Sequence, residues 1–138
     1  MMKKFLVAMD GSEEAMRAAQ IAFDLAAGIG GRVTLAHVVP FVVVPTDVPI
    51  DTGQLTAEAQ TAGEKMLLEA AQKLGQPDAH RVCLTGAAGD VLSELAENDN
   101  FDLVVVGSKG HNALTRVLVG SVTDRVVHVC KKPVLVVR

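Results

Sequence analysis

Residues 5–12 read FLVAMDGS, and this stretch decides the fold of the chain. Its first five residues are apolar without a break, which is typical of a central strand of a parallel sheet that is covered on both faces. Asp10 and Gly11 then end the strand. Ser12 is a good N-cap, and the two glutamates that follow it suit the positive end of a helix dipole. A strand that leads straight into a helix predicts an α/β protein.

The same alternation continues along the whole chain. Further Val-rich runs predict strands, and Ala- and Leu-rich segments between them predict helices, one of them from about residue 55 to 74 and another from 121 to 129. The strands are expected at 33–39, 81–85, 103–106 and 134–137. Right-handed crossovers restrict this pattern to a five-stranded, doubly wound parallel sheet of order 3-2-1-4-5 with helices on both faces. We expect one domain over residues 1–138.

Helical spacing also predicts which side chains face the core. The first helix is expected to bury one stripe and the second helix another. The stripe of the first helix comprises Ala18, Ile21, Ala22 and Leu25, and that of the second comprises Ala59, Ala62, Met66, Ala70 and Leu74.

Composition excludes several classes of function. The chain has 138 residues, a net charge of −3 and four Phe but no Trp or Tyr, so it lacks the basic and stacking groups of a nucleic-acid binder. No apolar run is long enough to span a bilayer, and we expect no membrane partner. The start of the chain does not resemble a signal peptide. Cys83 and Cys130 form no CxxC pair and are expected to be buried, inert thiols in a cytoplasmic protein.

The residues with functional meaning follow the first and fourth strands. In doubly wound sheets ligands bind beyond the strand carboxyl ends where the winding reverses, and these two strands end at Asp10 and Gly107. The segment GSKG at 107–110 is followed, after nine intervening residues, by Gly120 and Ser121 at the start of a helix. Glycine permits close approach of a ligand, and the free amides of a helix N-terminus attract anions. The arrangement suits a polyphosphate.

These residues carry a resemblance that covers essentially the whole chain. The segments VAMDGS (7–12), VVVGS (104–108), GSVT (120–123) and KPVLVVR (132–138), with the irregular stretch after the second strand, resemble the universal stress protein family. The Gly-x2-Gly-x9-Gly-Ser spacing resembles the branch of that family that binds ATP. The resemblance implies a Rossmann-like, adenine nucleotide alpha hydrolase-like fold. It also implies an ATP-dependent stress-response or signalling module, with Mg or Mn carried by the phosphates where a cation is needed.

The resemblance also implies roles for individual residues. Asp10, Ala8 and the backbone of Val38 would face adenine and ribose, the segment 107–110 would wrap ribose and phosphates, and the start of the last helix would bind phosphate oxygens. Lys109 stands where relatives often carry Arg or His, and Ala8 where some carry Pro. The expected nucleotide-binding residues are Ala8, Asp10, Val38, Gly107, Ser108, Lys109, Gly110, His111, Gly120, Ser121, Val122 and Thr123.

Simpler interpretations stay open for several of these residues. The glycines at 107 and 110 can be turn glycines, Asp10 can cap the first helix, and Lys109 and His111 can be solvated. His37, inside a strand, is expected to be a packed, hydrogen-bonded histidine, and no group of residues has the spacing of a metal site. No catalytic residue is predicted. The alternative functions are a slow ATP hydrolase, with only Asp10 and His111 to position water, and a dimeric interaction module of the same fold without nucleotide.

Two apolar segments lie outside the expected site. The run 41–44 either folds onto the core or forms part of a lid or subunit contact. The last strand, Val134–Val137, is expected at a sheet edge and carries no charge, so it invites pairing with a second copy of the chain. We therefore expect a homodimer that is formed through this strand.

Overall fold

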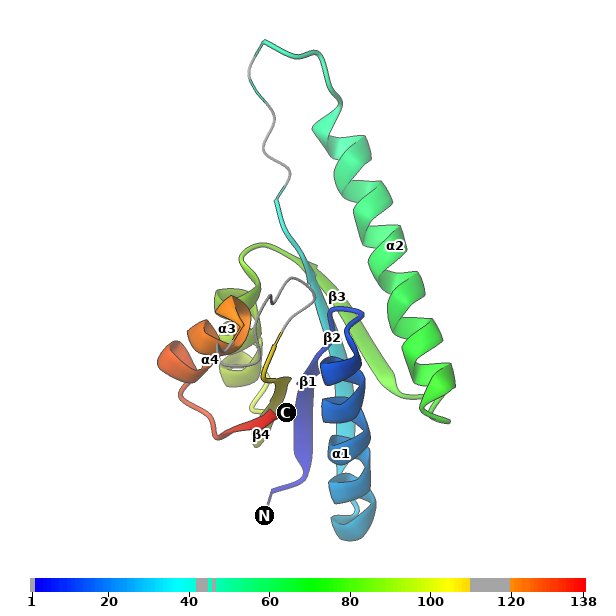
Figure 1. Cartoon of the computed structure of the whole chain (residues 1–138), viewed down its shortest axis with the longest axis vertical. Helices are drawn as coiled ribbons and strands as arrows, with labels where there is room; N and C mark the ends of the chain where they lie inside the picture. Colours follow the sequence, from blue (N-terminus) through cyan, green and yellow to red (C-terminus); the bar gives the residue numbers. More distant parts are fainter. Residues whose placement is uncertain (1, 42–44, 46, 110–119) are drawn as a thin grey trace.

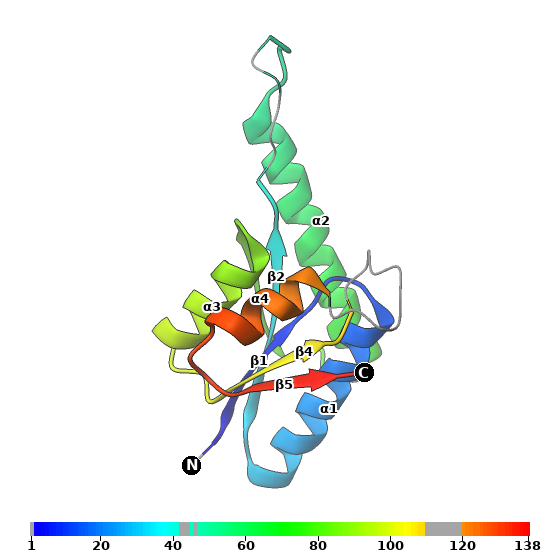
Figure 2. The same ribbon diagram turned by 60° about the vertical axis from the view of Figure 1, so that its left-hand side comes forward.

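The computed structural model describes residues 2–41, 45, 47–109 and 120–138 of the chain. Within these residues a parallel sheet has the order β3-β2-β1-β4-β5, as Figure 1 and Figure 2 show, which confirms the predicted doubly wound topology. In chain order the elements are β1 (Lys4–Ala8), α1 (Glu13–Ile29), β2 (Arg32–Val39), α2 (Thr52–Lys73), β3 (His80–Thr85), α3 (Ala88–Asn98), β4 (Leu103–Gly107), α4 (Ser121–Val129) and β5 (Val134–Val137).

The core lies in two layers, one on each face of the sheet. Helices α1 and α2 cover one face, and α3 and α4 cover the other (Figure 2). Successive side chains of a strand point to opposite faces, so Leu35 joins the layer under α1 and α2 while Ala36 joins the layer under α3 and α4. Aliphatic side chains fill both layers, with Phe5 in one and Phe101 in the other.

Helix α1 begins at the N-cap that the sequence predicts, but it buries a different face. The Ser12 hydroxyl accepts the amide of Ala15 at 3.1 Å, and Gly30 ends the helix in the left-handed conformation. The buried side chains are alanines, at positions 15, 18, 19, 22 and 26. The prediction that Ile21 and Leu25 face the core was wrong, since they are 38% and 45% exposed. Alanines let the helix lie close to the sheet and leave the larger side chains on its flank.

Helix α2 starts three residues earlier than expected because the Asp51 carboxylate caps it by accepting the amide of Gln54. The predicted inner stripe was wrong at Ala62, which is exposed, and it missed Gly63 and Leu67, which are buried. A Cβ on Gly63 would lie 2.7 Å from the Cys83 sulfur. Glycine is therefore used here to bring α2 against β3, at the expense of helix propensity.

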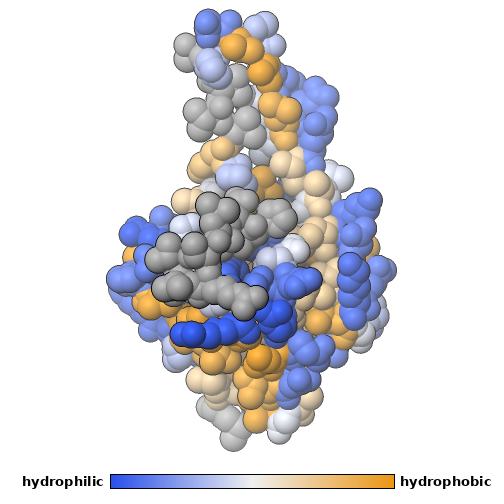
Figure 3. All heavy atoms as spheres, in the orientation of Figure 1, coloured by the Kyte–Doolittle hydropathy of each residue, from blue (hydrophilic) through white to orange (hydrophobic). Residues whose placement is uncertain are grey.

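An arm projects from the carboxyl edge of the sheet (Figure 1). We use this name for the described residues between β2 and α2, together with the first turns of α2. The arm exposes Phe41, Val48 and Ile50, and Figure 3 shows apolar surface along it. Phe41 is 71% exposed, so this residue does not fold onto the core, whereas the rest of the apolar run, residues 42–44, lies outside the described residues.

Candidate functional site

The turn between β1 and α1 forms the first half of the candidate site. An Asp10 carboxylate oxygen accepts the amide of Ser12 at 2.9 Å, and Gly11 between them has a φ of 83°, a value that favours glycine. Ser12, rather than Asp10, is the N-cap of α1. Asp10 therefore stabilises the turn that precedes the helix, and the interpretation of Asp10 as the helix cap was wrong.

The end of β4 and the start of α4 form the second half. Two hydrogen bonds join them: the Gly120 amide donates to the Ser108 carbonyl at 2.8 Å, and the Thr123 hydroxyl donates to the Gly107 carbonyl at 2.5 Å. The Ser108 amide in turn donates to the carbonyl of Val137 at the end of β5. These bonds hold the first turn of α4 directly beside the carboxyl end of β4.

The two halves meet at Gly107. A Cβ on this residue would lie 2.9 Å from the Cβ of Glu14 and 3.0 Å from its carbonyl carbon, in the first turn of α1. The absence of a side chain at Gly107 therefore lets β4 pass against the start of α1. This packing requirement is a structural reason for glycine at position 107, in addition to the ligand approach that the motif predicts.

The walls of the site near β1 and β2 are apolar. Ala8 and Val38 belong to the layer beneath α3 and α4, at the carboxyl ends of neighbouring strands. Val38 is 8% exposed, so most of this residue is buried in the core.

The start of α4 presents its backbone rather than a capping side chain. Gly120 is the N-cap and has no side-chain cap hydrogen bond, while Ser121 and Val122 are exposed. Thr123 is only 5% exposed and its hydroxyl donates to Gly107, so its side chain serves the fold. Ser108 and Lys109 are half-buried beside the end of β4. Gly110 and His111, also expected at the site, lie outside the described residues.

The structure adds a residue near the site whose role the sequence pattern did not indicate. His37 on β2 is packed and hydrogen-bonded, as predicted, but its partner is the Met9 carbonyl, 2.7 Å from Nδ1, directly before Asp10. The partner could not be identified from sequence because residues 9 and 37 meet only once β1 and β2 are in register. The remaining described histidines, His80 and His128, are exposed at element ends, as expected.

Neither cysteine was expected to take part in the site. Cys83 and Cys130 are free and half-buried, so they are more accessible than the sequence predicted. Burial raises the pKa of the Cys83 thiol, and the nearby Glu64 carboxylate raises it further, so Cys83 is a poor nucleophile at neutral pH. In the described part of the chain no group of three His, Cys, Asp or Glu side chains is placed to hold a metal ion.

Comparison with known proteins identifies the family. A family model described as the universal stress protein family matches residues 1–138. The chain belongs to the universal stress protein family. A universal stress protein of Methanocaldococcus jannaschii is 32% identical to the chain, over 99% of the chain and 82% of the relative. The resemblance that the motifs carry is thus confirmed at the level of the family.

Solved structures of universal stress proteins share the whole architecture. The universal stress protein UspA from Lactobacillus plantarum is 25% identical, with a TM-score of 0.85 over 99% of this chain and 97% of that one. A universal stress protein solved in complex with cAMP is 26% identical, with a TM-score of 0.73 over 99% of this chain and 97% of that one. Within residues 2–41, 45, 47–109 and 120–138, no helix combines the length and apolar character that a membrane crossing requires.

Proposed function

We propose that this universal stress protein binds an adenine nucleotide, ATP foremost, with the phosphates at the start of α4, and that it acts as a stress-response or signalling module whose partners respond to occupancy. Asp10, Ala8 and the backbone of Val38 serve the adenine and ribose end. The segment 107–110 and the residues Gly120, Ser121 and Val122 serve the phosphates. A divalent cation, Mg or Mn, is carried by the phosphates rather than by protein ligands.

The observation that carries this proposal is the glycine N-cap of α4. The first amides of a helix have no acceptor within the helix, and the helix dipole favours an anion beside them. Gly120 as the N-cap has no side chain to accept these amides, and the next two residues are exposed. Hydrogen bonds to Ser108 and Gly107 fix this helix start beside the end of β4. The Gly120 amide is taken by Ser108, so the donors that we propose for phosphate oxygens are the amides of Ser121 and Val122, with the Ser121 hydroxyl.

The adenine assignment draws on a relative. The universal stress protein solved in complex with cAMP shares 26% identity and the same fold with this chain, so an adenine nucleotide is the first ligand to test. The apolar side chains of Ala8 and Val38 suit a purine base. The hydrogen-bonded turn at Asp10 follows directly after the end of β1. A nucleotide with its phosphates at the start of α4 and its base at the end of β1 would lie across the point between β1 and β4 where the winding of the sheet reverses.

Calorimetry with ATP, ADP, AMP and adenosine tests the proposal, together with the variant Gly120→Val. The backbone of Gly120, with φ −60° and ψ 150°, is open to valine, so this variant should fold while its side chain blocks phosphate approach. Gly28→Val is the control, since nothing lies within 4 Å of a Cβ at that exposed helix position. We expect affinity to fall with loss of phosphates and to be lost in Gly120→Val alone.

A thermal shift gives an independent measurement. Ligand at a hundred times its dissociation constant adds about 2.7 kcal/mol of stability. Absence of any shift with millimolar ATP and magnesium would contradict the nucleotide proposal. It would favour instead a module of the same fold that acts only through protein contacts.

We also propose that the protein forms a two-fold dimer through β5, and three elements support this. The edge strand β5 exposes Val136 (37%). Arg17 of α1 donates to the carbonyl of Arg138, so this flank of α1 lies beside β5. Ile21 and Leu25 lie on the same flank, because each is four residues further along the helix, and both are exposed. An apolar edge of this kind suits a second copy of the same strand.

The other face of the sheet adds Val127 of α4, which is 49% exposed. Arg125 reaches Asp90 of α3, so Val127, two residues further on, lies on the opposite flank of the helix. Light scattering after size exclusion at micromolar concentration tests the dimer. We expect Val136→Lys to give a monomer and Val48→Lys, on the distant arm, to leave the dimer intact. A monomeric parent protein would refute the proposal.

A further inference from the structure

Both backbone polar groups of Met9 are held by neighbouring residues of β2. The ladder between β1 and β2 ends at Ala8 and Ala36, but the Met9 amide still donates to the Ala36 carbonyl at 2.7 Å. The Met9 carbonyl accepts from the His37 imidazole, with 2.7 Å between the oxygen and Nδ1. A carbonyl oxygen can only accept, so Nδ1 carries the proton. The side chain of His37 thus adds one hydrogen bond between β1 and β2 beyond Ala8 and Ala36, the last paired residues of these two strands.

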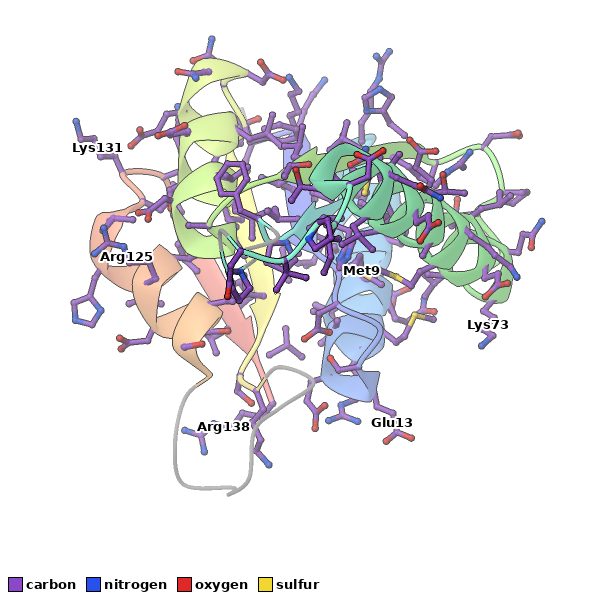
Figure 4. All side chains as sticks on the ribbon, turned by 90° about the horizontal axis from the view of Figure 1, so that it is seen from above. Met9, Glu13, Lys73, Arg125, Lys131 and Arg138 are labelled. Carbon is purple, nitrogen blue, oxygen red and sulfur yellow. The ribbon has the colours of Figure 1, made fainter. Side chains whose placement is uncertain are left out.

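This bond controls the direction in which the chain enters the Asp10 turn. The Met9 carbonyl and the Asp10 amide belong to one planar peptide unit, so fixing the carbonyl fixes the plane in which Asp10 begins. Asp10 then accepts the amide of Ser12, and the intervening Gly11 takes a φ of 83°. Met9 itself is 3% exposed, so water has little access to replace the imidazole as donor. Seen from above in Figure 4, Met9 lies near the middle of the molecule.

Helix α2 packs against the His37 imidazole ring and holds it in place. A Cβ on Gly63 would lie 2.8 Å from Cδ2 of His37 and 2.7 Å from the sulfur of Cys83, the residue opposite His37 on β3. The helix backbone therefore passes directly over the ring. Gln60, one turn earlier, donates to the Cys83 carbonyl at 2.6 Å and fastens this part of α2 to the sheet. The ring is confined between α2 and the strand, which leaves it little freedom to turn away from Met9.

We infer that His37 is a positioning residue for the adenine and ribose end of the nucleotide site. It acts through the Met9 carbonyl, and α2 keeps its ring aligned through the gap at Gly63. The inference rests on the proposed nucleotide function for the identity of the ligand. The positioning of the Asp10–Ser12 turn itself rests only on the hydrogen bonds and packing described above.

Two variants at one position separate this role from simple packing. His37→Asn keeps an N–H donor close to the place of Nδ1, whereas His37→Leu keeps volume and removes the donor. The probes are AMP affinity by calorimetry and hydrogen exchange of the Ser12 amide without nucleotide. In His37→Leu we expect AMP affinity to fall about fivefold to tenfold, the range that one hydrogen bond supplies. We also expect the Ser12 amide to exchange at least about tenfold faster in this variant.

In His37→Asn both quantities should stay within about twofold of the parent, consistent with a retained hydrogen bond. Phe101→Leu, in the opposite core layer, is the control for general destabilisation and should change neither AMP affinity nor the exchange of Ser12 relative to other amides of α1. Equal Ser12 exchange in the parent and in His37→Leu would overturn the inference. If the parent binds no adenine nucleotide, the proposed function fails, and the exchange comparison still decides the role of His37.

Discussion

The substitution Gly63→Ala tests whether α2 is seated on the sheet as described. Alanine in place of glycine inside a helix normally stabilises a protein by about 0.5–1 kcal/mol. Here the added Cβ would lie 2.7 Å from the Cys83 sulfur and 2.8 Å from Cδ2 of His37. Overpacking of this kind costs about 1–3 kcal/mol. We therefore expect a net loss of about 1 kcal/mol, or a fall of about 3–5 °C in Tm for a domain of this size.

Chemical and thermal unfolding measure the effect, with Gly28→Ala as the matched control. A Cβ at Gly28 meets nothing within 4 Å, so this helix substitution should raise stability by the usual amount. Cys83→Ala removes the nearer of the two contacts, and the double variant Gly63→Ala/Cys83→Ala should recover part of the loss, as coupling in a double-mutant cycle. If Gly63→Ala stabilises the protein as much as Gly28→Ala does, the packing of α2 on β2 and β3 described here is wrong.

Three further predictions follow from single interactions. The backbone amides of Lys3 and Lys4 donate to the Asp102 carboxylate and hold its pKa below the ordinary value of 3.8. The stability that Asp102 contributes is therefore present above pH 3.8 and is lost as the pH falls through the lower pKa of the folded state. Asp102→Asn should reduce the loss of stability at acid pH in a curve of unfolding free energy against pH. Cys83 should react with iodoacetamide more slowly than a small thiol at pH 8, and Glu64→Gln should speed it, as mass spectrometry would detect. Thr123→Val should lower the unfolding free energy by about 1–3 kcal/mol in denaturant titrations, because it leaves the last carbonyl of β4 without its donor.

The sequence predicted the order of the elements because each carries its own local signal. Val-rich runs marked the strands, and Ser12 marked the start of α1. The core face of α1 was predicted wrongly because helical spacing alone cannot distinguish a stripe that faces the sheet from a stripe on its flank. Ile21 and Leu25 are larger, yet the fully buried side chains of α1 are alanines.

The positions of candidate-site residues could be predicted where they depend on local sequence, but not where they depend on contacts between distant segments. Gly120 and Ser121 were expected at a helix start, and they lie there. The pairing of His37 with Met9, and the room that Gly63 leaves for it, depend on three elements brought together by the fold. No spacing in the sequence encodes such a contact, so the sequence indicated a packed histidine at position 37 without its partner and gave no role to Gly63.

The register of the sheet itself places the start of α4. Gly107 is paired with Val137 in the ladder between β4 and β5, and the next amide, that of Ser108, donates to the Val137 carbonyl at 2.7 Å. The Ser108 carbonyl accepts a hydrogen bond from the Gly120 amide, so the two bonds share one backbone residue. The edge strand and the helix N-terminus are thus joined through both polar groups of one backbone residue. A shift of β5 by one residue would remove the hydrogen bond from the Ser108 amide to the Val137 carbonyl and would displace the first turn of α4. The edge strand β5 therefore helps to position the candidate site.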